Sequence, residues 1–425
     1  MTDPEDLVER VREDDLRIHE LEDHADHDTA VEARRLLIER ETGTDLETIG
    51  DYGFPAEAAD STIENMIGAA QIPMGVVGPV AVNGEETSPN SQNSASSAND
   101  GGAASGDYYL PLATTEGALL ASVNRGLGVI RTAGGAAARV TKNGMTRAPV
   151  FRVEGVVEAA ETVEWVTENF EALREAAEST TSHGELLDVE PYVVGDSVYL
   201  RFAYDTKDAM GMNMVTIATG EACEIVEAET PASLVALSGN LCSDKKPAAI
   251  NAVEGRGRSV TADVLIPGEL VEERLHTTAD AIAEANTRKN LIGSAKAGSL
   301  GFNAHAANVV AAAFLATGQD EAQVVEAANT ITTMDARERE DGTTDLYASV
   351  SLASLEVGTV GGGTKLPTQS EALEVLGLRG GGDPAGSNAD ALAEIIAVGA
   401  LAGELSLLAA LASRHLASAH EDLGR

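Results

Sequence analysis

Residues 390–420 read DALAEIIAVGALAGELSLLAALASRHLASAH, and this stretch decides how the chain folds. Its apolar residues occupy most faces of a helical repeat. A surface helix keeps one polar face, whereas a helix that is apolar nearly all round has to be buried. The sequence therefore predicts a deeply packed helix here. Long Ala-rich segments predominate from about Leu237 onward.

The rest of the chain has a mixed pattern. Its 425 residues are too many for one ordinary core, so several domains sharing a large central one are expected. Residues 1–50 are predicted to form two helices, the second preceded by Asp28 and Thr29. Residues 149–236 alternate apolar strands with a helical pattern, which indicates an α+β unit. Residues 88–106, rich in Ser, Asn and Gly, are predicted to be a flexible surface insertion.

The charge is strongly acidic. The sequence has 69 Asp and Glu against 29 Lys and Arg, a formal net charge of −40. Such a potential repels nucleic acid and anionic membrane surfaces, so neither is an expected partner. The acidity, the 42 glycines and the 3% aromatic content resemble proteins of salt-loving organisms, although an acidic protein adapted to moderate salt is the alternative.

The chain is expected to be cytoplasmic. Two cysteines are too few for a disulfide framework, and the first residues show no pattern of a signal peptide. The longest stretch without charged residues, 297–319, contains polar Asn303 and Asn308, so no membrane span is predicted. His24 and His27 are interpreted as part of a solvated acidic loop, and no metal site is assigned.

Three short stretches could carry chemistry, each with a simpler alternative. DAMGMNM (208–214) suits a flat ring or a nucleotide, but on spacing alone core packing is the better explanation of its three methionines. In DKKP (244–247) a lysine beside an acid could hold an oxyanion, unless this is a surface turn. In TTEG (114–117), Glu116 could be a partly buried proton donor with a raised pKa or an acid that caps a helix. No phosphate-binding loop or complete G-x-G-x-x-G motif is present.

The order of these stretches resembles one family. ENMIGAAQIPMGVVGP, PLATTEGALLASVNRG, GMTRAPV, DAMGMNM, DKKPAAIN, NAHAANVVAAAFLATGQD and EVGTVGGGT look like the motif series of 3-hydroxy-3-methylglutaryl-coenzyme A (HMG-CoA) reductases, from about residue 60 onward. DKKPAAIN and the helical start resemble class I, the archaeal and eukaryotic type, and the composition resembles that of halophilic archaeal enzymes. We expect no membrane anchor of the eukaryotic kind.

The resemblance implies NADPH-dependent reduction of HMG-CoA to mevalonate and CoA, in the pathway of isoprenoid synthesis. Lys245 would stabilise the developing oxyanion, Glu116 would donate a proton, and Asp320 would link the two. His420, on a mobile tail of residues 412–425, would protonate the leaving thiolate, as a group with a pKa near neutrality is suited to do.

The resemblance also implies binding residues. Contacts to the substrate would come from eight positions: Arg147, Ser238, Asp244, Lys246, Lys289, Asn308, Asn124 and Arg125. Contacts to the nicotinamide cofactor would come from another eight: Asp208, Met210, Gly211, Met212, Asn213, Met214, Gly361 and Gly362. His305 is interpreted as structural.

The implied fold is a large α/β domain around a central helix, formed by residues 51–148 and 237–411. A small ferredoxin-like α+β cofactor domain, residues 149–236, would be inserted in it. The family's active site forms between subunits, so a homodimer or a dimer of dimers is expected.

The sequence departs from the family at three places. Ala252 and Ala419 replace a common tryptophan and serine. Ser182-His183-Gly184 lacks the usual cation for a 2′-phosphate, so the preference for NADPH rests on the resemblance alone. Two other hypotheses are a dehydrogenase for another acyl-CoA or hydroxy acid, and a CoA-binding paralogue without catalysis.

Overall fold

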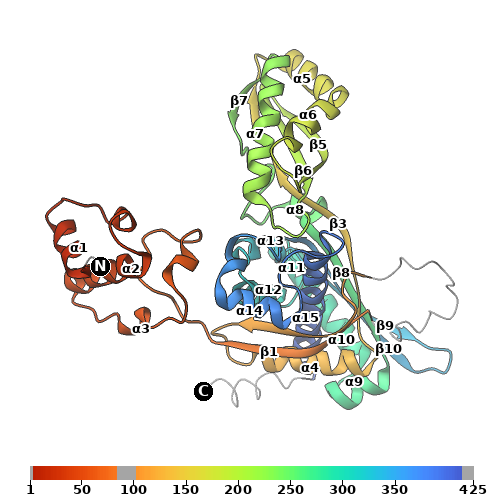
Figure 1. The fold of residues 1–425 in the computed structure, drawn as a ribbon. Coiled ribbons are helices and arrows are strands. Elements are labelled where there is room, and N and C mark those ends of the chain that lie inside the picture. The colour runs from red at the N-terminus through yellow and green to blue at the C-terminus, as the bar shows by residue number, and fades with distance from the viewer. Residues whose placement is uncertain (1–2, 84–101, 414–425) are drawn as a thin grey trace.

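Helix α15 (Ser387–Ala412) runs through the centre of the body in the computed structural model, which describes residues 3–83 and 102–413 (Figure 1). Leu392, Ile395, Leu401 and Leu405 on its different faces are all completely buried. The prediction of a deeply packed helix is thus confirmed. The helix is long and apolar enough to cross a membrane, but 83% of its most apolar 18-residue stretch is buried inside the body, as in a core helix.

Two buried carboxylates on α15 hold neighbouring segments. Glu404 accepts hydrogen bonds from the backbone N–H groups of Ala304 (2.7 Å) and His305 (2.6 Å) and from the Thr332 hydroxyl (2.7 Å). Glu394 accepts one from the N–H of Ala104 at 2.8 Å, and burial raises its pKa. Buried polar groups need such partners, so the two glutamates fix these segments on an otherwise apolar helix.

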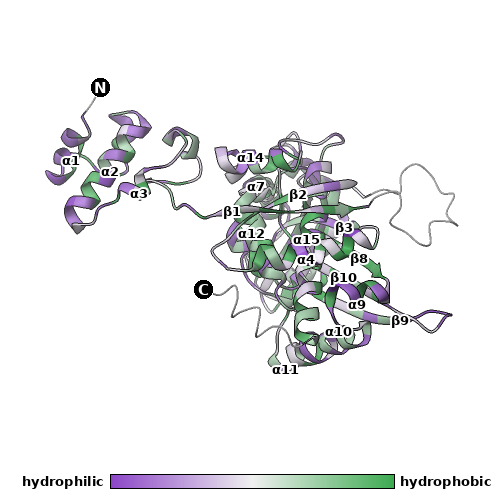
Figure 2. Ribbon diagram, turned by 90° about the horizontal axis from the view of Figure 1, so that it is seen from below, coloured by the Kyte–Doolittle hydropathy of each residue, from purple (hydrophilic) through white to green (hydrophobic). Residues whose placement is uncertain are grey.

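The body is built on an antiparallel sheet. Strands β3 (Ala137–Arg147), β8 (Arg256–Ile266), β10 (Thr344–Leu355) and β9 (Ile331–Glu338) lie in that order. A separate pair is formed by β1 (Met74–Val82) and β2 (Gly106–Ala113). Hydrophobic residues of α15 and of strands β8 and β10 form the core of the body, and α15 lies in its centre in Figure 2 as well.

Several helices surround α15. They are α4 (Leu119–Thr132), α8 (Ala249–Val253), α9 (Gly268–Leu275), α10 (Ala279–Asn286), the π-helix η4 (Thr287–Gly293), α11 (Ser294–Ala297), α12 (Ala306–Thr317), η5 (Glu321–Gln323), α13 (Val324–Ala327), η6 (Gly362–Lys365) and α14 (Pro367–Val375). Two short ones, η5 and α13, come next after α12 in the chain. They bring polar residues to the base of the protruding unit.

An α+β unit protrudes from the body (Figure 1). Its elements are β4 (Val150–Arg152), α5 (Val156–Glu168), α6 (Phe170–Glu178), β5 (Glu185–Val194), β6 (Ser197–Asp205), α7 (Met212–Glu229) and β7 (Ser233–Ala236). The antiparallel strand order β7-β4-β6-β5 is that of a ferredoxin-like split β-α-β unit. Because the end of β3 pairs with β6, the sheet continues from the body into this unit.

The N-terminal helices form a small unit with its own core, set apart from the body in Figure 1. They are α1 (Pro4–Arg12), η1 (Leu21–Asp23), α2 (His27–Thr42), α3 (Glu47–Gly50) and η2 (Ala56–Ala59). The second helix starts earlier than predicted, because the side chain of Asp26, not of Asp28, accepts the N–H of Thr29 (3.0 Å). Of the predicted insertion, residues 88–101 lie outside the described residues.

Candidate active site

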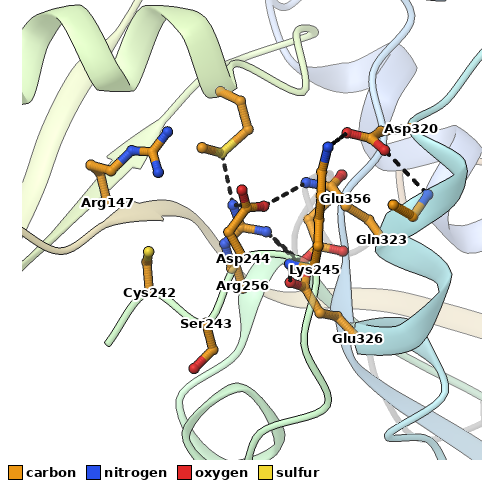
Figure 3. Close-up of polar contacts among 12 residues, drawn as sticks. Arg147, Cys242, Ser243, Asp244, Lys245, Arg256, Asp320, Gln323, Glu326 and Glu356 are labelled. Carbon is orange, nitrogen blue, oxygen red and sulfur yellow. Dashed lines mark hydrogen bonds and ion pairs between the residues drawn. The ribbon is translucent and has the colours of Figure 1, made fainter. Parts of the chain in front are cut away.

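Lys245 and Asp320 form an ion pair at the base of the protruding unit (Figure 3). Lys245 lies in the loop between β7 and α8, and Asp320 follows α12. The Lys245 Nζ lies 2.8 Å from Asp320 Oδ2, and this hydrogen bond raises the pKa of the lysine. The lysine side chain is still 47% exposed, so its ammonium can reach a ligand while remaining charged.

The loop around Lys245 has an unusual backbone. Asn240, Ser243 and Lys245 all have a positive φ, which is 58° for the lysine, a conformation that disfavours residues with a side chain. The backbone N–H of Lys245 donates a hydrogen bond to Oε1 of the buried Glu326. The neighbouring Lys246 donates from its Nζ to the carbonyl of Asp244 at 2.8 Å. The loop is therefore held from beneath, and this argues against a plain surface turn.

Glu116 lies just before α4. Its Oε1 accepts a hydrogen bond from the Asn308 side chain of α12 at 3.3 Å. The expectation of partial burial is wrong, because Glu116 is exposed. The capping alternative fails as well, since Ala118 occupies the cap position of α4 and no side chain bonds there. Within residues 3–83 and 102–413, no hydrogen bond or ion pair links Glu116 to Lys245 or Asp320.

His305 supports Asn308. Its Nε2 lies 2.9 Å from the carbonyl of Gly403 on α15, and its Nδ1 lies 3.4 Å from the Asn308 side-chain nitrogen. A carbonyl only accepts, so Nε2 carries the hydrogen and Nδ1 accepts from Asn308. These contacts agree with the structural interpretation of His305. His420 lies outside the described residues.

Four of the predicted substrate residues lie near the Lys245 loop. Arg147, at the end of β3, donates from Nε to the Thr216 hydroxyl at 3.0 Å. Asp244 accepts from Arg256 at 3.0 Å. The Ser238 hydroxyl lies 3.7 Å from the sulfur of Cys242. With Lys246, these residues place two cations, one carboxylate and one hydroxyl around one loop.

The other predicted substrate residues lie on separate elements. Lys289 is exposed on the π-helix η4. Asn124, on α4, accepts a hydrogen bond from the N–H of Gly78 at 2.9 Å. The neighbouring Arg125 donates to the hydroxyl (3.0 Å) and the carbonyl (2.6 Å) of Ser406, and burial lowers its pKa. Arg125 thus fastens α4 to α15.

The two predicted cofactor segments lie side by side. Ala209 and Val360 form a parallel β-bridge, and the N–H of Thr359 donates to the carbonyl of Asp208 at 2.8 Å. Gly361 and Gly362 have φ of 79° and 51°, and a Cβ added at either one would meet no atom within 4 Å. Their backbone thus borders open space, into which a ligand could approach closely.

The rest of DAMGMNM leads into α7, with Gly211 at the cap position and Met212 and Asn213 as the first helical residues. The N-terminus of such a long helix favours an anion. Met210, Met212 and Met214 pack against the core of the protruding unit, so the core-packing alternative holds in part. The sulfur of Met214 accepts from the Thr181 hydroxyl at 3.2 Å, next to the Ser182-His183-Gly184 turn.

Asp208 has a role that its sequence context did not indicate. Its carboxylate is buried and accepts four backbone hydrogen bonds, from Gly382 (2.9 Å), Gly386 (2.7 Å), Asn388 (3.1 Å) and Ala389 (3.1 Å). These groups surround the N-terminus of α15. Asp208 therefore anchors the cofactor segment to the central helix, and its oxygens are already engaged.

Sequence reasoning missed three charged residues. Arg256, Glu326 and Glu356 are completely buried beneath the Lys245 loop, and Arg256 bonds to both glutamates (Figure 3). Arg256 lies in the stretch VEGRGR (253–258), which follows DKKPAAIN and also resembles the family, yet no role was predicted for it. The glutamates come from segments 70 and 100 residues away, so only the folded chain brings them together.

A cavity of about 810 Å³ lies between the N-terminal segment and the body. Its wall includes Tyr52, Phe54, Met74 and Gln369. Glu321, the residue after Asp320, also lines it. The cavity is large enough for a small molecule, but Lys245 and Asp320 do not line it.

An accessible lysine–aspartate pair beside an open glycine-rich backbone indicates an enzyme. The profile of the family described as hydroxymethylglutaryl-coenzyme A reductase matches residues 30–425. The chain belongs to this family, which makes it an oxidoreductase and confirms the resemblance.

Comparison with individual proteins gives the same family. The chain is 73% identical, over the full length of both, to the 3-hydroxy-3-methylglutaryl-coenzyme A reductase of Haloferax volcanii. It is 69% identical to that of Halobacterium salinarum, over 100% of this chain and 99% of the other. In fold it is similar to a class II reductase structure from Streptococcus pneumoniae described as bound to NADPH, with a TM-score of 0.64, 20% identity and coverage of 93% of this chain and 100% of that one.

Proposed function

We propose that the protein catalyses the NADPH-dependent, four-electron reduction of (S)-HMG-CoA to mevalonate and CoA. The observation that carries this proposal is the ion pair of Lys245 and Asp320, two residues in stretches that resemble the family's motifs. Reduction of a thioester places negative charge on one oxygen, first in a hemithioacetal and then in the reduction of mevaldehyde. A fixed, accessible cation is the group that stabilises such a charge.

Lys245 acts as the oxyanion-stabilising group. Its hydrogen bond to Asp320 raises its pKa, so the ammonium stays charged at neutral pH. Glu116 delivers the proton to the oxygen, and Asn308 holds its carboxyl. Asp320 connects Lys245 to Glu116 once substrate is bound. His420 protonates the CoA thiolate when that group leaves.

The substrate is bound by its anionic groups. Arg147, Lys246 and Lys289 supply cations for the carboxylate of the HMG group, with Ser238, Asp244 and Asn308 as hydrogen-bonding partners. Asn124 and Arg125 on α4 lie toward CoA. Among the described residues the Arg147 guanidinium bonds only to the Thr216 hydroxyl, so an incoming carboxylate displaces a weak partner.

Two molecules of NADPH, bound one after the other, would each supply one hydride. The open backbone at Gly361 and Gly362 and the start of α7 fit a nucleotide. Met210, Gly211, Met212, Asn213 and Met214 line this place, and Asp208 fixes it to α15. The similar fold of a reductase described as bound to NADPH supports the choice of cofactor.

The working form is a homodimer or a dimer of dimers with the active site between subunits. Ile72, just before β1, and Met74 and Val76 in it support this, because these apolar residues are 38%, 45% and 50% exposed. The carboxyl of Glu116 is also exposed, and a second subunit would shield it from solvent. Residues 149–236 form the cofactor domain and residues 51–148 and 237–411 the substrate domain, in a cytoplasmic enzyme.

The test is consumption of NADPH with HMG-CoA in multimolar KCl, comparing wild type with Lys245→Ala. We expect two NADPH per HMG-CoA from wild type and no turnover from the folded variant. If folded wild type oxidises neither NADPH nor NADH with HMG-CoA, the proposal fails.

A further inference from the structure

A buried cluster of charges lies directly beneath Lys245 (Figure 3). Arg256, at the start of β8, has no exposed surface. Its Nη1 lies 2.9 Å from Glu326 Oε2 and 3.3 Å from Glu356 Oε1, and its Nη2 lies 3.0 Å from Asp244 Oδ1. One guanidinium therefore serves three carboxyl groups, two of them completely buried.

The cluster contacts both the loop that carries Lys245 and the segment proposed for the cofactor. Glu326 accepts the backbone N–H of Lys245 on its Oε1 and Arg256 on its Oε2. Arg256 Nη2 also lies 2.7 Å from the sulfur of Met212 at the start of α7. The positive-φ backbone that presents Lys245 is thus joined through two side chains to the segment proposed for the cofactor.

The charges do not balance if every carboxyl is ionised. Arg256 and Lys245 carry two positive charges, whereas Asp244, Asp320, Glu326 and Glu356 would carry four negative ones. An uncompensated charge in a dry interior is costly, and a carboxyl responds by keeping its proton. Two carboxyls against one guanidinium share a proton in this way.

The geometry distinguishes the two glutamates. Both oxygens of Glu326 accept donors, as a carboxylate does. Only Oε1 of Glu356 does so, and its buried Oε2 has no partner among the described residues. Burial raises the pKa of Glu356 well above its ordinary value, and the negative charge of the neighbouring Glu326 raises it further.

We propose that Glu326, as a carboxylate, is a positioning residue that holds both Arg256 and the backbone of Lys245 in the catalytic conformation, and that Glu356 beside it is a neutral acid. This inference rests on the proposed function of Lys245. The two glutamates touch neither substrate nor cofactor. Glu326 fixes the backbone from which the lysine reaches the developing charge.

Two isosteric substitutions separate the roles. Glu356→Gln keeps a neutral group of the same shape whose oxygen can still accept from Arg256, so kcat should stay close to that of wild type. Glu326→Gln cannot accept from both the Lys245 N–H and Arg256, because an amide accepts on its oxygen only. Lys245 should then shift, and a misplacement of about 1 Å lowers kcat about 100-fold.

The measurement is kcat and KM for HMG-CoA and NADPH, on full-length oligomeric protein in multimolar KCl. A drop in kcat for Glu326→Gln with a nearly unchanged KM for HMG-CoA, and normal kinetics for Glu356→Gln, supports the proposal. If both variants keep kcat, or both lose it equally while folded, the proposal is wrong. Inactive wild type would instead refute the proposed function.

A spectroscopic measurement keeps the proposal testable if a variant does not fold. Infrared spectra of wild type in D2O should show the C=O band of a protonated carboxylic acid at neutral pH. The Glu356→Gln variant should lack this band. If Glu326→Gln does not fold, Glu326→Asp should lose kcat, because its shorter side chain cannot reach both donors. Wild type without an acid band overturns the proposal.

Discussion

The ammonium of Lys245 lies 2.8 Å from the carboxylate of Asp320, and the two residues come from opposite sides of the site. Lys245 follows the protruding unit in sequence, whereas Asp320 follows α12 of the body. Their contact brings together motifs 75 residues apart in the chain (320 − 245 = 75). The pair sets the charge state of the lysine, and this leads to the first prediction.

Asp320→Asn should move the pH profile of kcat/KM. The hydrogen bond with Asp320 is the main cause that raises the pKa of Lys245. Without the carboxylate the lysine loses its proton at a lower pH, and the neutral amine cannot stabilise an oxyanion. The alkaline limb of the profile is therefore expected to shift to lower pH.

Asp341→Asn is the matched control, because Asp341 lies in the exposed turn between β9 and β10. Its profile should superimpose on that of wild type. An unchanged alkaline limb in active Asp320→Asn would show that Lys245 does not set it.

The sequence predicted what depends on composition and on motif position. The burial of α15 follows from its apolar faces, whatever its neighbours are. The Lys245–Asp320 contact was predicted because both residues stand in motifs that resemble the family. Contacts that depend on long-range packing were missed. The acid that opens DAMGMNM gave no sign that its carboxylate binds four N–H groups 174 to 181 residues further along.

The sequence also led to a wrong prediction of which side chains are exposed. Glu116 was expected to be partly buried because apolar residues follow it, but those residues face inward along α4 while the glutamate stays outside. Arg256 and its two glutamates were not predicted as a group either. Local patterns do not show which buried charges will meet, because each lies in a different element.

Asp208→Ala should destabilise the protein. The carboxylate accepts four backbone N–H groups around the start of α15. Loss of a single cap costs up to about 2 kcal/mol, and here the groups are buried, so the loss should reach at least that value. Thermal unfolding at fixed KCl measures it.

The control for this change is Asp196→Ala, at the exposed turn between β5 and β6. Its midpoint of unfolding should match that of wild type. An equal midpoint for Asp208→Ala would contradict the anchoring role and would return Asp208 to the set of cofactor contacts.

Stability should fall when KCl is removed. The net charge of −40 produces repulsion that counterions screen, and the screening length grows from about 3 Å at 1 M to about 10 Å at 0.1 M salt. The midpoint of thermal unfolding should therefore decrease as KCl is lowered from the molar range. An increase, or no change, would contradict adaptation to high salt.

Two glycines on α4 should respond in opposite ways to alanine. A Cβ at Gly126 would lie 2.0 Å from the carbonyl oxygen of Ala402 on α15, and neither backbone can move freely. Gly126→Ala should thus separate the two helices and cost more than about 2 kcal/mol, as overpacking does. Because α4 carries Asn124 and Arg125, KM for HMG-CoA should rise as well.

Gly128, two residues along the same helix, is the matched control. A Cβ there would meet no atom within 4 Å. Gly128→Ala should therefore stabilise the protein by about 0.5 to 1 kcal/mol, since alanine loses less backbone entropy in a helix. Denaturant unfolding of both variants at constant KCl provides the comparison. If Gly126→Ala is as stable as Gly128→Ala, the close approach of α4 and α15 does not hold the core together, and the helix that carries Asn124 must be positioned by other contacts.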